Sequence, residues 1–123
     1  MLQHGLTTPQ APARVVIMGA AGFVGAAIRR RLEGRGVPVL ALTRKQVDLL
    51  DNGAAEKLAG LLQSTDCFLA VSALAPVKNA AMLRDNITMI AAMADALKAK
   101  PVAHVVNIGS DAVFADSDGP LSE

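Results

Sequence analysis

The sequence predicts an α/β fold of the doubly wound type, three layers in which helices cover both faces of a largely parallel sheet. Short apolar runs alternate along the chain with segments of helical periodicity. These runs are continuously apolar, as in parallel strands that are buried on both faces. The composition agrees, because 52% of the residues are hydrophobic and the chain has no Trp or Tyr, so the core must be aliphatic. At 123 residues the chain forms one domain at most.

Charge and cysteine content narrow the class of protein. A net charge of +1 gives no reason to expect nucleic acid as a partner. Cys67 is the one cysteine, so the chain has no internal disulfide, which fits a reducing cytoplasm. The sequence has no apolar run of about eighteen residues and no signal-peptide pattern, so we expect no membrane span and no membrane partner.

The amino terminus differs in composition from the rest of the chain. Residues 1–13 carry Gly, Pro, Thr and Gln without periodicity, so we expect a loose tail followed by one domain over 14–123. His4 in this tail has no companion ligand, and we expect no metal site.

The stretch from Arg14 to Gly25 predicts a strand, a tight turn and the start of a helix. The apolar run 15–18 leads into glycines at 19, 22 and 25. In this order Gly19 permits the turn, Gly22 lets backbone N–H groups approach a pyrophosphate, and Gly25 lets the helix pack close to the strand. The phosphates would then lie at the positive end of the helix dipole. A glycine-rich turn without a ligand is the alternative.

The remaining elements follow in alternation. After the glycines, Val24, Ile28 and Leu32 recur every four residues and place one apolar stripe of a helix against the sheet. Asp48 could cap the next helix, although Asp51 and Asn52 are better placed for this. We expect further strands at 37–42, 46–50, 66–71 and 102–109, and further helices at 53–63 and about 79–98.

The residues that follow the second strand bear on the choice of cofactor. In a dinucleotide-binding unit this strand ends at the adenosine ribose, where a carboxylate binds the 2′-hydroxyl of NAD. Here the positions are Thr43, Arg44 and Lys45. Two cations in place of the carboxylate favour the 2′-phosphate of NADP. Alternatively, Arg44 and Lys45 face water at a loop.

The helix over 79–98 carries two apolar stripes. We expect the first to pack on the sheet; it consists of Leu83, Ile87, Ile90, Ala94 and Leu97. The second consists of Met82, Asn86, Met89, Met93 and Ala96. A solvent-facing side would not need three methionines, so we expect the second stripe to be a partner surface, or to be covered by another part of the same polypeptide.

The spacing G-x-x-G-x-x-G resembles the short-chain dehydrogenase/reductase superfamily, and particularly its extended branch of NAD(P)-dependent epimerases, dehydratases and reductases. Further stretches resemble this family in the correct order: Asp48-Leu49, Ser72-Ala73-Leu74, Asn86, and Gly109-Ser110 with the ending Pro120-Leu121-Ser122-Glu123. The resemblance implies a Rossmann fold with right-handed crossovers.

The resemblance also implies roles for these residues. Asp48 and Leu49 would touch the adenine ring, Ser72 and its neighbours would line the cofactor, and Asn86 would brace the active-site backbone. Ser110 aligns with the catalytic Ser/Thr whose hydroxyl bonds the reacting substrate oxygen, although an ordinary strand-end serine is the alternative. The cofactor-binding residues that we expect are therefore Gly19, Gly22, Phe23, Val24, Gly25, Thr43, Arg44, Lys45, Asp48, Leu49, Ser72, Ala73, Leu74 and Asn86.

By this resemblance the chain is the cofactor-binding part of an oxidoreductase that transfers hydride between the cofactor, NADP in preference to NAD, and a small-molecule substrate. A nucleotide-sugar is the expected substrate class, and the 79–98 helix would join a second copy in a homodimer. The family's proton-transferring tyrosine is missing because the chain has no tyrosine, so we expect the domain to be truncated before the Tyr-x-x-x-Lys helix. The alternative is a non-catalytic NADP-binding or redox-sensing module of the atypical short-chain dehydrogenase type.

Overall fold

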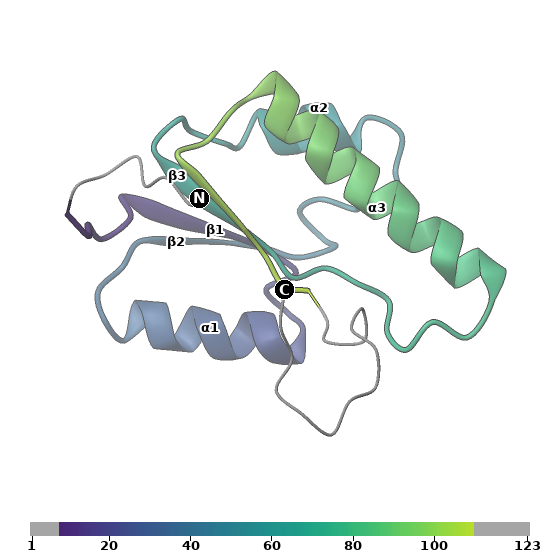
Figure 1. The fold of residues 1–123 in the computed structure, drawn as a ribbon, viewed down its shortest axis with the longest axis horizontal. Coiled ribbons are helices and arrows are strands. Elements are labelled where there is room, and N and C mark those ends of the chain that lie inside the picture. The colour runs from purple at the N-terminus through teal and green to yellow at the C-terminus, as the bar shows by residue number, and fades with distance from the viewer. Residues whose placement is uncertain (1–7, 110–123) are drawn as a thin grey trace, which may run out of the picture.

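The computed structural model describes residues 8–109, which form a three-layer α/β unit (Figure 1). Helix α1 covers one face of the sheet, and helices α2 and α3 cover the other. The four described strands pair in parallel in the order β2-β1-β3-β4. The strands are β1 (Arg14–Met18), β2 (Val39–Leu42), β3 (Asp66–Ala70) and β4 (His104–Asn107), and the helices are α1 (Phe23–Glu33), α2 (Ala54–Ala59) and α3 (Ala80–Ala99).

Strand β1 is central because it pairs with β2 on one side and β3 on the other. Val16 lies between Leu40 and Phe68 in this register. Since all strands run in the same direction, the segments that follow β1, β2 and β3 emerge at the same edge of the sheet. This edge is where ligands bind in open α/β sheets.

Each face of the sheet has its own hydrophobic core, since successive side chains of a strand point to opposite faces. Val16 and Phe68 are fully buried on the face covered by α2 and α3. Ile17 and Leu69 belong to the core under α1. Truncation of a side chain as enclosed as Phe68 costs about 3–5 kcal/mol of unfolding free energy, so these strands form a rigid base for the loops at their carboxyl ends.

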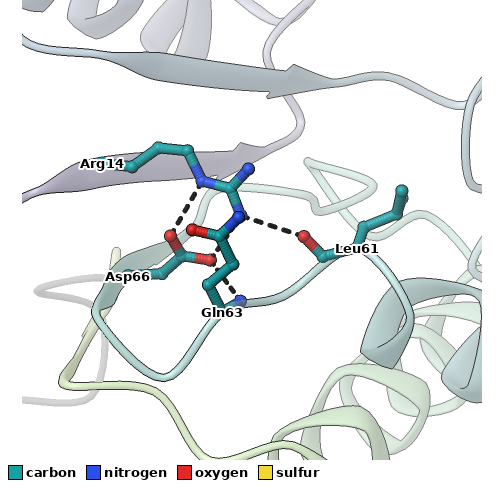
Figure 2. Close-up of polar contacts among 4 residues, drawn as sticks. All are labelled: Arg14, Leu61, Gln63 and Asp66. Atoms are coloured by element: carbon teal, nitrogen blue, oxygen red, sulfur yellow. Dashed lines mark hydrogen bonds and ion pairs between the residues drawn. The ribbon is translucent and has the colours of Figure 1, made fainter.

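An ion pair joins β1 to β3 at the opposite, amino-terminal edge of the sheet (Figure 2). Arg14 and Asp66 are partners in the strand register, and Arg14 donates from Nε and Nη2 to the two carboxylate oxygens at 2.8 and 2.7 Å. The Asp66 carboxylate also accepts from the Gln63 N–H at 2.7 Å, while Arg14 donates to the Leu61 carbonyl at 3.0 Å. Burial of Asp66 disfavours its charge, but these hydrogen bonds outweigh that effect and the pKa of Asp66 lies below its ordinary value.

The prediction of a third strand at 46–50 is wrong, since the structure has turns there. Its apolar side chains are nevertheless buried, Val47 to 1% and Leu49 to 4% exposure. Local hydrogen bonds, instead of a strand ladder, hold this segment: the Val47 N–H donates to the Thr43 carbonyl, and the Leu50 N–H donates to the Asp48 side chain. The prediction that an acidic or amide side chain caps α2 is wrong too, because Gly53 occupies the N-cap position and no side chain bonds the first N–H groups there.

Helix α3 packs on the sheet with the opposite face from the one expected. Its buried residues are Met89, Met93 and Ala96, all on the stripe that we expected to form a partner surface or to be covered by another part of the same polypeptide; the second alternative is the one that the structure shows. Leu83, Ile87 and Ile90 of the other stripe are 52%, 59% and 60% exposed, while Leu97 of the same stripe is half-buried and packs against the core. Methionine fills irregular gaps in a core well, and Met89 and Met93 serve that purpose here, whereas Met82 is only half-buried. In the described part of the chain no helix is long and apolar enough to cross a membrane.

Candidate functional site

A pocket of about 220 Å³ lies at the carboxyl edge of the sheet, where the segments after three parallel strands meet. Each of these segments contributes a wall, and α3 contributes one side chain. The lining residues are Gly19, Ala21 and Gly22 after β1, Thr43 and Arg44 after β2, Val71, Ser72, Ala73 and Leu74 after β3, and Met89 of α3.

The turn after β1 requires glycine at its first position. Gly19 has a φ of 105°, which L side chains rarely adopt, and an added Cβ would lie 2.8 Å from the Ser72 Oγ. The N–H groups of Gly19 and Ala20 both donate to the Leu42 carbonyl at 3.0 Å. The turn is therefore held tightly against the ends of β2 and β3.

The other two glycines of the motif differ in what surrounds them. A Cβ at Gly25 would lie 2.2 Å from the Gly19 carbonyl oxygen, so the absence of a side chain lets α1 pack directly on the turn. At Gly22 the nearest atom would be 3.5 Å away, an ordinary van der Waals contact, and the backbone is extended. The fold thus has room for a Cβ at Gly22, and the absence of a side chain there leaves the wall of the pocket open.

Helix α1 begins at this wall. Gly22 is its N-cap, which has no side chain to bond the first N–H groups, and the first turn contains no acidic residue. These N–H groups have no acceptor within the helix, and they carry the positive end of the helix dipole. Phe23 is 93% exposed and Val24 is 44% exposed, so the helix packs through Gly25, Ile28 and Leu32, and Val24 does not join the expected apolar stripe.

The residues after β2 place a cation at the mouth of the pocket. Arg44 lines the pocket with its side chain 77% exposed, and its Nε donates to Asp48 Oδ2 at 2.6 Å. This hydrogen bond raises the pKa of Arg44 and lowers the pKa of Asp48. Lys45 is exposed and does not line the pocket.

Asn86 joins α3 to the pocket wall. Its side-chain oxygen accepts from the Leu74 N–H at 2.8 Å, and its side-chain nitrogen donates to the Leu74 carbonyl at 2.9 Å. Both hydrogen-bonding groups of one backbone residue are thereby satisfied by one side chain. Met89 lies one turn further along the same face of α3 and lines the pocket, so Asn86 fixes both the loop and the rotation of the helix.

The structure brings half of the expected cofactor residues to the pocket: Gly19, Gly22, Thr43, Arg44, Ser72, Ala73 and Leu74. The others are near it in sequence or support it without lining it: Phe23, Val24, Gly25, Lys45, Asp48, Leu49 and Asn86. Leu49 is only 4% exposed, so little of its side chain could contact a ligand. Ser110, the expected catalytic residue, lies outside the described residues, as does His4.

Sequence reasoning missed three lining residues, namely Ala21, Val71 and Met89. Ala21 and Val71 each adjoin an expected site residue, so their neighbours were the available signal. Met89 lies three residues after Asn86 and hence on the same side of the helix. This signal was overlooked because the stripe that contains both residues was expected to be a partner surface. Among residues 8–109 no three His, Cys, Asp or Glu side chains are grouped so that they could hold a metal ion.

Comparison of the sequence with known families identifies one match. A model of the NAD dependent epimerase/dehydratase family matches residues 15–123. No curated protein matches the sequence significantly.

Three solved structures have a similar fold at low sequence identity. A GDP-L-fucose synthetase from Naegleria fowleri bound to NADP is 18% identical over 99% of this chain, with a TM-score of 0.77, and 40% of that protein is covered. For UDP-N-acetylglucosamine 4-epimerase from Bacillus cereus the identity is 18%, the TM-score 0.71, and the coverage 89% of this chain and 45% of that one. A GDP-mannoheptose C4 reductase from Campylobacter jejuni with NADP bound is 19% identical, with a TM-score of 0.69, and the match covers 94% of this chain and 38% of that one. The chain therefore spans less than half of these proteins, and the likeness establishes its Rossmann-type fold.

Proposed function

The chain belongs to the NAD dependent epimerase/dehydratase family, and we propose that its pocket binds the dinucleotide cofactor with the pyrophosphate against Gly22 and the first turn of α1. The observation that carries this proposal is the open wall at Gly22, where the fold has room for a side chain and the sequence has none. Free N–H groups at the start of α1 supply donors for phosphate oxygens. Typical ligand pockets measure about 300–1,000 Å³, so this smaller pocket suits one part of a dinucleotide, and the rest would extend along the sheet edge.

The experiment that tests this proposal is a substitution of Gly22 that leaves the fold intact. We expect Gly22→Val to abolish NADPH binding in calorimetric titration, because its side chain would occupy the space of the pyrophosphate. Gly60→Val is a matched control, since an added Cβ there would also meet its nearest atom at 3.5 Å, on a helix end away from the pocket. Binding by folded Gly22→Val equal to that of the unaltered chain would mean that the glycine serves the turn alone.

The cofactor would supply a hydride donor or acceptor, and the parent enzyme would use it on a nucleotide-sugar or a related carbonyl or hydroxyl compound. The names of three similar structures contain a sugar nucleotide, which supports this substrate class. Within this chain, Ser110 is the residue that we propose to bond the reacting oxygen. Arg44 at the pocket mouth supports a preference for NADP over NAD.

A non-catalytic NADP-binding or redox-sensing module is the second candidate, because the chain contains no tyrosine for the proton transfer that the family performs. The two candidates differ in one test. Hydride exchange between NADPH and a sugar-nucleotide substrate in the parent protein, with loss in Ser110→Ala, would support the enzyme; binding of cofactor without any exchange would support the module.

We also propose that the exposed stripe of α3 packs against a second copy of the chain, and that the protein works in the cytoplasm. Leu83, Ile87 and Ile90 support the first point, because three large apolar side chains on one helix face are exposed. Sedimentation would test it: Ile87→Glu should leave only the monomer, and a sedimentation coefficient that is the same for both proteins would contradict the dimer. The single cysteine, Cys67, is the support for a reducing compartment.

A further inference from the structure

Arg44 and Asp48 form an ion pair beside the pocket that the family resemblance did not anticipate. Arg44 Nε lies 2.6 Å from Asp48 Oδ2, and the two side chains are very unequally exposed, at 77% and 21%. Arg44 lines the pocket and Asp48 does not. The pair therefore joins an exposed cation at the pocket mouth to a more sheltered carboxylate behind it.

The carboxylate is the fixed member of this pair. Asp48 Oδ1 accepts from the Leu50 N–H at 3.0 Å, and the adjacent Val47 and Leu49 side chains are buried. Two core side chains therefore anchor the backbone on both sides of Asp48, and a local bond orients its carboxylate. An arginine side chain that pairs with a carboxylate fixed in this way gives up much of its rotamer freedom before any ligand binds.

The atom that Arg44 uses decides what remains for a ligand. The bond to Asp48 is made by Nε, and in the described part of the chain this is the one carboxylate within ion-pair distance of Arg44. The two terminal nitrogens of a guanidinium form a planar fork that matches phosphate geometry. Pairing through Nε therefore leaves both terminal nitrogens of the Arg44 guanidinium available to bond a phosphate.

The charge around Arg44 is too mixed to select a phosphate by itself. Asp48, Asp51 and Asp85 all raise the pKa of Arg44, so three carboxylates lie within its electrostatic range. Lys45 adds one positive charge that does not line the pocket. Discrimination in favour of a phosphate must then come from hydrogen bonds of fixed direction.

We propose that Asp48 is a positioning residue that orients Arg44 toward the 2′-phosphate, and that it thereby sets the selectivity of the site for NADP over NAD. This inference rests on the proposed function, since it places the cofactor's adenosine end at Arg44. It gives Asp48 a different task from the adenine contact that the resemblance implies. The proposed role of Asp48 also differs from that of a carboxylate that binds the ribose 2′-hydroxyl directly, because a direct contact of that kind would favour NAD.

The test is a double-mutant cycle with two cofactors. Dissociation constants for NADPH and NADH are measured by calorimetry for the unaltered chain, Asp48→Asn, Arg44→Ala and the double variant. Asn keeps an amide oxygen for the Leu50 N–H, but its amide nitrogen cannot accept from Arg44 Nε. Glu33→Gln is the matched control, because Glu33 pairs in the same way with Arg29 Nε at 2.8 Å on α1, away from the pocket.

We expect Asp48→Asn to weaken NADPH binding about two- to tenfold, the factor that corresponds to ordering one long side chain. NADH binding should not change, Glu33→Gln should have no effect on either cofactor, and Asp48→Asn should cost nothing further once Arg44 is Ala. Equal losses for NADPH and NADH would show a direct contact to ribose or adenine and overturn the inference. Tighter NADPH binding by Asp48→Asn would overturn it as well, since the carboxylate would then compete with the phosphate. If the unaltered chain bound neither cofactor, the proposed function itself would fail, and this inference with it.

Discussion

Gly19, Gly22 and Gly25 illustrate that one motif can place three different demands on a residue. Gly19 has a backbone conformation that favours glycine, and Gly25 has no space for a Cβ. Gly22 has both an ordinary backbone conformation and space. Gly19 and Gly25 thus explain the fold of the turn, whereas the reason for a glycine at position 22 is the proposed cofactor site.

The Arg14–Asp66 pair makes a prediction about pH. The pKa of Asp66 is lowered in the folded chain from an ordinary value of 3.8, because the bonds from Arg14 and Gln63 outweigh the cost of burial. Folded chains therefore bind fewer protons at this site than unfolded chains. The stabilisation is fully present above the unfolded pKa and is lost as the pH falls through the lower, folded pKa.

We expect Asp66→Asn to be about 3 kcal/mol less stable than the unaltered chain at pH 7, near the lower end for a broken buried pair because Arg14 is partly exposed. Urea unfolding of both proteins at a series of pH values measures the difference. The difference should shrink below about pH 4, where unfolded Asp66 takes up a proton. A difference that stayed constant down to pH 2 would show that the charge of Asp66 is unimportant.

At the scale of elements, periodicity predicts that α3 is a helix but not which side of it faces the sheet. Both stripes are apolar and both have helical spacing, so hydrophobicity alone does not distinguish them. The structure distinguishes them through Asn86, whose two bonds to Leu74 turn the methionine side toward the pocket and the core. A pair of hydrogen bonds between residues twelve positions apart leaves no mark on the local sequence pattern.

The orientation of α3 predicts losses of stability of different size for two truncations. Met93→Ala should lower the free energy of unfolding by about 2–4 kcal/mol, since Met93 is 6% exposed and its removal leaves a cavity. Ile87→Ala should lower it by less than about 1 kcal/mol, because Ile87 is 59% exposed. Urea unfolding at a low protein concentration provides both values. The reverse order would mean that the helix packs with its other side.

The segment at 46–50 shows a second limit of the sequence pattern. Its apolar residues correctly predict burial of Val47 and Leu49, but burial does not require a strand. The Gln46 and Val47 N–H groups both donate to the Thr43 carbonyl, and the Leu50 N–H donates to the Asp48 side chain. Turn bonds of this kind can take the place of ladder bonds, so the apolar pattern could not separate the two outcomes.

At the scale of the whole molecule, the sequence predicts the layers, the parallel strands and the sheet edge that carries the pocket. These follow from the order of elements, because parallel strands with helical crossovers bring their carboxyl ends together. About half of the expected site residues line the pocket because they directly follow β1, β2 and β3. Strand order does not place Met89, which depends on the rotation of α3, or the pairing of Asp48 with Arg44, which depends on turn geometry.

The measurement that most directly tests the central claim is calorimetric titration of the chain with NADPH and, separately, with NADH. We predict that both bind, and that NADPH binds about tenfold or more tightly than NADH, as a charge-assisted pair of hydrogen bonds to the 2′-phosphate would produce. Circular dichroism of the same sample establishes that the chain is folded. A folded chain that bound neither cofactor would contradict the claim that the open wall at Gly22 admits a pyrophosphate.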